Sequence, residues 1–348
     1  MARMDGKLDI ILIWMIVLIL AGSTALLRKG HNFMIAHQFP IDRADAFVVV
    51  AGPTASGKSA MSLDIARQID GNIINADSLQ VYRDLNILSA RPDAASLLAV
   101  PHALYGVMDG ADRCSVGIWL ELARLAVAEA RNAGKVPILV GGTGMYLNAS
   151  LMGISTIPDI PKHVRTEMTA MHKKMGAERF HATLNTYDPV LASRLASSDK
   201  QRLIRGMEVF MHTKTPLSWW QKQPLVGRIN GCGHTVVLNP PREAVYKSID
   251  CRLESMVEKG AIEEVERLVA RQLDPGLPVM KALGVSQIAR FLKGTLTRDD
   301  AIFQAKQASR HYAKRQMTWI RNNFISNYEI NETYSKSLLE KNFPIIFS

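Results

Sequence analysis

The sequence of 348 residues predicts an α/β protein. Its core is a mostly parallel sheet with helices on both faces, built around a P-loop, and a helical domain is inserted into this core. Three observations predict this fold. Short apolar runs alternate with segments of helical length within residues 45–153, which is typical of parallel strands joined by helices. A glycine-rich turn directly follows the first apolar run. Strand signals then disappear between residues 154 and 222, where the pattern is helical.

The elements of the core follow from local signals. A buried strand is expected at the first apolar run, residues 47–51, and a helix follows the glycine-rich turn over residues 59–69. Ser115 predicts the start of a helix that runs to Gly134, because Ser is favoured at an N-cap and Gly directly after a helix. Further strands are expected at residues 73–77, 136–140 and 234–238.

The remaining segments complete the domain organisation. Helical patterns return after the last strand and continue from residue 242 to residue 322. No internal repeat interrupts this order. We therefore expect an N-terminal extension at residues 1–33, a P-loop core at 45–153, a helical insertion at 154–222, the C-terminal part of the core with basic helices at 223–325 and a tail at 326–348.

The composition indicates a folded chain with an anionic partner. Hydrophobic residues make up 47% and charged residues 21%, which excludes a disordered protein. The formal net charge of +10 favours nucleic acid, phosphates or an anionic membrane surface as a partner. The cysteines Cys114, Cys232 and Cys251 show no C-x-x-C spacing, so neither a disulfide framework nor a cysteine-rich zinc site is expected.

The N-terminal extension carries an apolar run at residues 10–21. This run is shorter than the roughly 20 residues that a membrane helix needs. A signal-peptide core fits its length better, although Asp5 and Asp9 weaken the positive flank that such a peptide requires. A third interpretation is that translation starts at Met34. We prefer this third interpretation and expect no stable membrane association.

The strongest motif is G-x-x-x-x-G-K-[ST] between the first strand and its helix. Glycines let backbone N–H groups wrap around a phosphate, and the start of the helix adds positive potential. Lys58 is expected to contribute charge to the terminal phosphate, and Ser59 a hydroxyl ligand for Mg²⁺ as the cofactor. The motif predicts phosphate binding without naming the molecule that carries the phosphate. This phosphate loop consists of Gly52, Pro53, Thr54, Ala55, Ser56, Gly57, Lys58 and Ser59.

Two further loops are expected beside the phosphate loop, because ligands gather at the carboxyl ends of parallel strands. Asp77 ends the second strand and is followed by Ser78, Leu79 and Gln80. Asp77 is a candidate Mg²⁺ ligand, general base or helix N-cap. Thr143 follows the third strand between glycines and fits either a site residue or an ordinary tight turn.

Basic helices are the third feature of interest. Over residues 199–212 one helical face is apolar, and the other carries Gln201, Arg202, Arg205 and Glu208, which is compatible with an ordinary solvated face. Residues 301–328 contain no acidic residue. Like charges at a spacing of four residues repel one another unless an anion compensates them, so this second helix favours an RNA or phosphate contact. Its charged stripe consists of Lys306, Arg310 and Lys314.

Six ordered blocks of this sequence resemble tRNA dimethylallyltransferases. The resemblance implies a cytoplasmic, monomeric transferase that moves a dimethylallyl group from dimethylallyl diphosphate to N6 of the adenosine 3′ of the tRNA anticodon. It implies that the P-loop, a motif of ATP- and nucleotide-binding proteins, holds the diphosphate of the prenyl donor. Members of this family start shortly before the first strand, which favours Met34. The blocks are residues 52–59, 77–82, 101–102, 141–147, 199–205 and 310–319.

The resemblance also implies roles for individual residues. Asp77 is the expected base at the adenine amine, Thr143 and Lys58 complete the catalytic group, and Arg242 joins the phosphate loop in binding the donor. Ser248 stands where the family has an arginine. If that arginine binds diphosphate, either Lys247 or another residue replaces it or the affinity for the donor falls. The expected tRNA contacts are Asp77, Ser78, Leu79, Gln80, Thr143, Arg165, Gln201, Arg202, Leu203, Ile204, Arg205, Arg310 and Lys314.

Three other functions are compatible with a P-loop. A small-molecule kinase needs no basic C-terminal helix of the kind seen at residues 301–328. An isopentenyltransferase of free adenine nucleotides needs neither this helix nor the segment at residues 201–205. A non-enzymatic RNA-binding ATPase switch is the third alternative. It differs from the main hypothesis in that it transfers no prenyl group to tRNA.

Overall fold

A computed structural model describes residues 45–347 of the chain. The apolar run at residues 10–21 and the start at Met34 lie outside these described residues. Within residues 45–347, no helix is long and apolar enough to cross a membrane.

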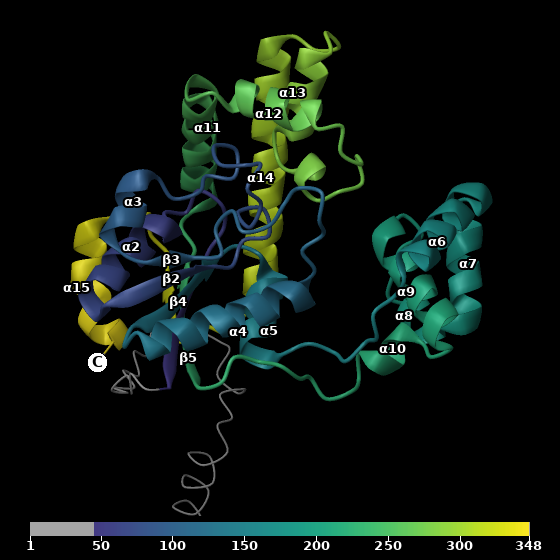
Figure 1. The fold of residues 1–348 in the computed structure, drawn as a ribbon, viewed down its shortest axis with the longest axis horizontal. Helices are drawn as coiled ribbons and strands as arrows, with labels where there is room; N and C mark the ends of the chain where they lie inside the picture. The colour runs from purple at the N-terminus through teal and green to yellow at the C-terminus, as the bar shows by residue number, and fades with distance from the viewer. Residues whose placement is uncertain (1–44, 348) are drawn as a thin grey trace, which may run out of the picture. The chain divides into compact units, whose positions relative to one another are not determined.

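The core is a six-stranded sheet in which every neighbouring pair of strands is parallel, with the order β3-β2-β4-β1-β5-β6. The predicted parallel sheet is therefore confirmed, and β3 and β6 are additional strands that the sequence analysis did not predict. Figure 1 shows the twisted sheet surrounded by helices. The strands are β1 (Ala46–Ala51), β2 (Gly71–Asn75), β3 (His102–Ala103), β4 (Val136–Gly141), β5 (Cys232–Leu238) and β6 (Tyr328–Ile330).

Helices cover both faces of this sheet, as predicted. Side chains of a strand alternate between faces, so Phe47 and Val49 of β1 pack into one core and Val48 and Val50 into the other. The first core includes α4 (Val116–Asn132) and α5 (Gly144–Met152), and the second includes α2 (Lys58–Ile69). Ser115 caps α4 as expected, because its Oγ accepts a hydrogen bond from the N–H of Ile118 at 3.2 Å.

The predicted helical insertion is present and has a core of its own. Phe180, Leu184, Leu203 and Met207 are fully buried among its helices. The chain leaves and re-enters the sheet domain at an antiparallel bridge between Ile154 and Val226, slightly beyond the predicted limit at residue 222. The helices are α6 (Lys162–Met175), α7 (Ala177–Tyr187), α8 (Pro189–Ala192), α9 (Lys200–Thr213) and α10 (Leu217–Trp220).

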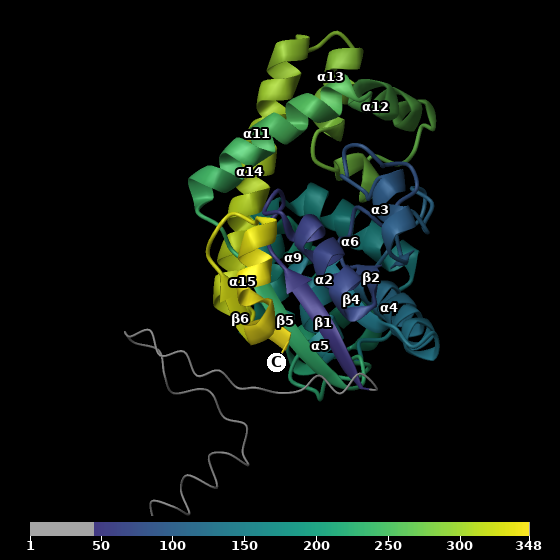
Figure 2. The same ribbon diagram turned by 90° about the vertical axis from the view of Figure 1, so that its left-hand side faces the viewer.

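The C-terminal helices are also where the sequence predicts them. The long helix α14 (Arg298–Asn323) lies beside α11 (Arg242–Glu258), as Figure 2 shows. Ion pairs join the two helices. A short helix, α3 (Ala94–Ala99), precedes β3. The C-terminal helices are α11 (Arg242–Glu258), α12 (Ala261–Ala270), α13 (Val285–Leu292) and α14 (Arg298–Asn323), with a 3-10 turn at Val279–Lys281.

The described part of the predicted tail, residues 326–347, differs from the prediction. It contains β6, which pairs in parallel with β5, and α15 (Lys336–Phe347), whose Leu339 is buried in the core that α2 also lines. Tyr334 donates a hydrogen bond to Asp64 of α2 at 2.6 Å. A strand of three residues is too short to show a periodic pattern, which is why the sequence alone does not reveal that this segment belongs to the core.

Candidate active site

The phosphate loop has the geometry of an anion site. Gly57 adopts φ +93° and Ala55 φ +62°, left-handed conformations of the kind found in anion-binding turns. Within the described residues no side chain caps the first turn of α2, so the N–H groups at its start have no side-chain acceptor. The hydroxyl of Ser56 is buried and has no hydrogen-bond partner within the described residues. The loop therefore fits a phosphate group, which supplies the acceptors that these donors lack.

Lys58 lies in this loop with a perturbed pKa. Its Nζ donates to the carbonyl of Pro53 at 3.3 Å. Burial lowers the pKa of Lys58 to about 8, the negative charge of Asp77 opposes this shift, and Arg252 adds to it. A bound anion would raise the pKa of Lys58 again, so Lys58 is expected to be protonated when an anion is bound.

The residues present also fit Mg²⁺. Ser59 follows Lys58 and is exposed, which leaves its hydroxyl accessible as a ligand. No group of three His, Cys, Asp or Glu side chains suited to a metal occurs within residues 45–347. Because Mg²⁺ commonly binds one or two protein oxygens together with substrate phosphates and water, Ser59 suits a metal that is also held by a phosphate group.

Asp77 is held at the end of β2 by a network of hydrogen bonds. Its backbone N–H donates to Oδ1 of the buried Asn75 at 2.8 Å, and its own Oδ1 accepts from the N–H of Leu79 at 2.9 Å. The residues after Asp77 form a turn rather than a helix, so the N-cap hypothesis is wrong. The roles of general base and metal ligand stay open for this carboxylate.

Thr143 is joined to the segment that carries Asp77. Its Oγ1 accepts from the N–H of Ser78 at 3.0 Å and donates to the hydroxyl of Ser78 at 3.3 Å. Tyr312 of α14 lies beside it; burial raises the pKa of this phenol, the charge of Asp77 raises it further and a hydrogen bond with Thr143 lowers it. The structure thus brings the predicted residues Asp77, Ser78 and Thr143 together.

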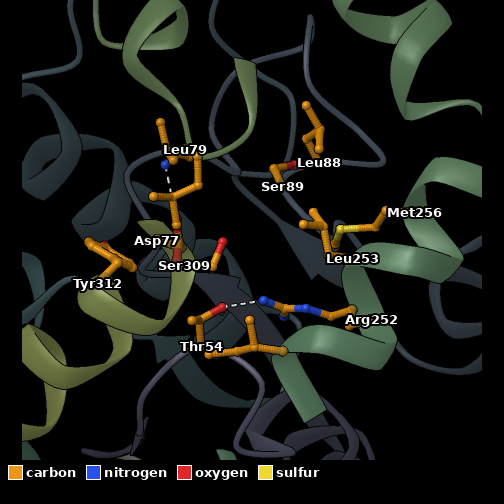
Figure 3. Close-up of a pocket in the computed structure, with 12 residues that line it drawn as sticks. Thr54, Asp77, Leu79, Leu88, Ser89, Arg252, Leu253, Met256, Ser309 and Tyr312 are labelled. Atoms are coloured by element: carbon orange, nitrogen blue, oxygen red, sulfur yellow. Dashed lines mark hydrogen bonds between the residues drawn. The ribbon is translucent and has the colours of Figure 1, made fainter. Parts of the chain in front are cut away.

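A pocket opens between these loops and α11 (Figure 3). Thr54 and Asp77 supply a polar end, and Nη2 of Arg252 donates to Oγ1 of Thr54 at 2.5 Å. The rest of the lining is mainly apolar. The pocket therefore joins an anion-binding end to a surface suited to a short hydrocarbon. Its lining residues are Thr54, Asp77, Leu79, Leu88, Ser89, Ile249, Arg252, Leu253, Met256, Leu283, Ser309 and Tyr312.

Arg252 is a site residue that the sequence analysis did not assign. Burial lowers the pKa of Arg252, and the negative charge of Asp77 opposes this shift. The guanidinium of Arg252 and the carboxylate of Asp77 therefore interact electrostatically. Arg242, the predicted donor-binding residue, is exposed at the start of α11, donates to the hydroxyl of Tyr246 at 2.8 Å and does not line the pocket. Ten residues of helix span about 15 Å, so the two arginines cannot serve the same position. Arg252 lies at helical spacing from the other α11 residues that line the pocket, Ile249 and Met256. This spacing is the sequence signal that could have identified Arg252 as a site residue.

A second groove borders the pocket and shares Arg252 and Met256 with it. Ser59 and Gln80 line this groove. Gln80 is a predicted tRNA contact. Its Nε2 donates to the carbonyls of Ser89 and Ala90 at 2.8 and 3.0 Å, so in this structure its amide stabilises the loop that contains these two residues.

The predicted contacts on α9 divide into two groups. Gln201 and Arg202 are exposed. Leu203 and Ile204 are 0% and 7% exposed and belong to the core of the insertion, so their side chains are not at the surface and their contact with tRNA stays a prediction. Their burial follows from the apolar face of the helix, which the insertion needs for its own stability.

Glu208 also departs from the expected solvated face, because its side chain is 0% exposed. Its Oε1 and Oε2 accept from Nη2 and Nε of Arg165, both at 2.8 Å, and Arg205 donates to the same carboxylate at 2.7 Å. Burial alone would raise the pKa of Glu208, but the hydrogen bonds from both arginines outweigh burial and lower it. Arg165 and Arg205 are thus oriented by one buried carboxylate.

The charged stripe on α14 is compensated within the protein. Arg310 forms a two-pronged ion pair with Asp250, and Lys306 pairs with Glu254 at 2.5 Å. Both acids come from α11. The expectation that this stripe needs an external anion is therefore wrong for Lys306 and Arg310, because acidic residues distant in sequence neutralise them. Lys314 is exposed.

Comparisons with family models and known proteins give consistent matches. The family model described as IPP transferase matches residues 80–323, and the model described as isopentenyl transferase matches residues 46–104. The tRNA dimethylallyltransferase of Rhodospirillum rubrum is 47% identical over 294 residues, which cover 84% of this chain and 90% of that protein. The corresponding enzyme of Hyphomonas neptunium is 46% identical over 279 residues, covering 80% and 88%.

Solved structures show the same fold. The tRNA isopentenylpyrophosphate transferase of Bacillus halodurans is 30% identical, has a TM-score of 0.61 and is matched over 86% of this chain and 94% of its own. A eukaryotic dimethylallyltransferase captured acting on tRNA has a TM-score of 0.71 at 22% identity, over 86% and 79%. From the sequence identities and the extent of the family-model match, we conclude that this chain belongs to the tRNA dimethylallyltransferase family.

Proposed function

We propose that this protein transfers a dimethylallyl group from dimethylallyl diphosphate to N6 of the adenosine 3′ of the anticodon in tRNA, releasing diphosphate. The observation that carries this proposal is a single pocket in which an anion-binding loop, an apolar wall and the carboxylate of Asp77 meet. The enzyme acts as a cytoplasmic monomer. Names of relatives that act on tRNA support the acceptor, and the chemistry of the pocket supports the donor.

The donor is held by its diphosphate and its hydrocarbon at different ends of the pocket. Backbone N–H groups of the phosphate loop, Lys58 and Arg252 bind the diphosphate oxygens. Ser59, which lines the adjoining groove, would hold Mg²⁺. When bound there, the metal would supply positive charge that stabilises the leaving diphosphate. The five-carbon chain lies against Leu79, Leu253 and Met256, which exclude water from the reacting carbon.

The acceptor is a neutral amine, which is a weak nucleophile. Asp77 takes a proton from N6 as the bond between N6 and C1 of the donor forms and the bond between C1 and the diphosphate oxygen breaks. The N–H of Leu79 binds Oδ1 of Asp77, which leaves Oδ2 for this proton. The adenine leaves the anticodon stack to reach the pocket, at a cost of a few kcal/mol.

Basic residues outside the pocket hold the RNA by its phosphates. Arg202 on α9 and Lys314 on α14 are exposed cations suited to this role, and Arg165 and Arg205 present guanidinium groups that Glu208 orients. Recognition by backbone phosphates depends on the shape of the anticodon stem more than on its sequence.

One experiment tests the proposal directly. The protein is incubated with unmodified tRNA, Mg²⁺ and dimethylallyl diphosphate, and the digested tRNA is analysed by nucleoside mass. We expect adenosine with one added dimethylallyl group, and no such product when ATP replaces the donor. Turnover of ATP without any prenylated adenosine would instead support an ATPase switch or a kinase.

A further inference from the structure

We propose that Gln316 is a positioning residue that fixes the donor-binding loop and the acceptor-binding loop to each other, so that binding of diphosphate at one loop strengthens binding of tRNA at the other. This inference rests on the function proposed above. It assigns to α14 a direct part in substrate coupling, in addition to its part in the fold.

The geometry that carries this inference is a two-sided contact. Gln316 is 5% exposed. Its Oε1 accepts from the N–H of Thr54, in the phosphate loop, at 2.8 Å, and its Nε2 donates to the carbonyl of Gly142, beside Thr143, at 2.8 Å. The partners lie 262 and 174 residues away in sequence. One amide group therefore joins the loops that follow β1 and β4.

The chemistry of this position requires an amide. A carboxylate lacks the donor for Gly142 and a thioether lacks both partners, so either would leave a buried backbone group unpaired at a cost of about 1–3 kcal/mol. The approach is also close: a Cβ on Gly142 would lie 2.2 Å from Nε2 of Gln316. Glycine at position 142 is what allows the amide of Gln316 to reach the loop.

Each partner of Gln316 is connected to a residue of the proposed substrate site. Thr54 receives the guanidinium of Arg252 on its hydroxyl, at the diphosphate end of the pocket. Gly142 precedes Thr143, which binds the backbone of Ser78 next to Asp77. A shift of one loop is therefore transmitted to the other, and the distance between C1 of the donor and N6 of the acceptor depends on both. A misplacement of about 1 Å can reduce a rate about 100-fold.

The test compares Gln316→Met with Gln307→Met, an exposed position on the same helix. Thermal unfolding, single-turnover prenylation, diphosphate affinity and tRNA affinity with and without saturating inorganic diphosphate are measured for wild type and both variants. In the wild type and in Gln307→Met, we expect diphosphate to increase tRNA affinity about 5-fold or more. In Gln316→Met, we expect this ratio to approach one and the single-turnover rate to fall about 10- to 100-fold.

The decisive quantity is the coupling ratio, which a purely structural role of Gln316 would leave intact in the folded fraction. An unchanged ratio in Gln316→Met, or equal tRNA affinity with and without diphosphate in the wild type, would overturn the inference. If Gln316→Met does not fold, Gln316→Glu, which keeps the bond to Thr54 and loses that to Gly142, is measured in the same way. Wild-type protein that binds both ligands cooperatively but forms no prenylated adenosine would refute the proposed function while leaving the coupling role standing.

Discussion

Arg252 of α11 donates a hydrogen bond to the hydroxyl of Thr54, 198 residues earlier in the phosphate loop. This contact brings a guanidinium to the end of the pocket where the diphosphate is proposed to bind. We expect Arg252→Ala to reduce affinity for dimethylallyl diphosphate by about 10- to 100-fold, the loss of one to two hydrogen bonds to a charged group. Arg242→Ala on the same helix is the matched control and is expected to change affinity little. Equal losses in both variants would contradict the assignment.

Asp77→Asn separates the two roles that remain for this carboxylate. If Asp77 is the general base, single-turnover prenylation falls by about 10²–10⁴ while affinities for donor and tRNA change little. If it is chiefly a Mg²⁺ ligand, donor affinity falls together with the rate and excess Mg²⁺ partly restores both. Rates and donor binding are measured across a Mg²⁺ series. A variant within about threefold of the wild-type rate would remove Asp77 from catalysis.

The lowered pKa of Lys58 predicts a pH dependence of donor binding. With a pKa of about 8, Lys58 loses its charge in the free protein as the pH rises above 8, whereas bound diphosphate favours the protonated form. Affinity is therefore expected to fall by about fivefold between pH 8 and pH 9, and binding is expected to take up a proton in this range.

Lys58→Arg keeps its charge throughout that range and is the control, since it retains any titration of the ligand itself. Calorimetric titrations in buffers of different ionisation enthalpy measure the proton uptake. The same pH dependence in wild type and Lys58→Arg would exclude Lys58 as its source.

Salt dependence distinguishes the exposed lysine of α14 from the paired arginine. Each phosphate contact contributes about one unit to the slope of log affinity against log salt concentration. We expect Lys314→Ala to reduce this slope for tRNA by about one unit. Arg310→Ala is expected to reduce it less, because Arg310 already pairs with Asp250, and to lower thermal stability instead. A larger change in slope for Arg310→Ala than for Lys314→Ala would reverse this assignment.

Glu208 is expected to stabilise the helical insertion in a pH-dependent way. Its folded-state pKa lies below the ordinary value of 4.5, so its contribution is present above pH 4.5 and is lost as the pH falls through the folded pKa. We expect Glu208→Gln to lower the free energy of unfolding at pH 7 by about 1–3 kcal/mol, toward the lower end because both arginines are partly exposed.

Urea unfolding at pH 7 and pH 4 measures this effect. The exposed Glu167→Gln on α6 serves as the control and is expected to leave stability unchanged. If Glu208→Gln is as stable as the wild type at pH 7 and loses as much stability as the wild type at pH 4, the buried cluster does not stabilise the insertion.

The parts of this protein that the sequence reveals are those with a local signal. The phosphate loop is a contiguous motif, the buried strands are short apolar runs, and Ser115 marks the start of α4 by its own hydrogen bond. Helical periodicity identifies the insertion and the apolar face of α9. Such signals arise from residues within one or two turns of each other, so no knowledge of the fold is needed to find them.

The tertiary structure decides which charges and amides meet. Asp250 neutralises Arg310 from 60 residues away, and Glu208, on the polar side of an amphipathic pattern, is buried beneath Arg165. In the sequence, Gln316 is one polar residue in a helical pattern. Its contacts with two loops result from the packing of α14 against them. The strand β6 is held by its pairing with β5 and has no pattern of its own. Periodicity shows which face of a helix is apolar, but the identity of the neighbour depends on long-range packing, whose free energy no short segment contains.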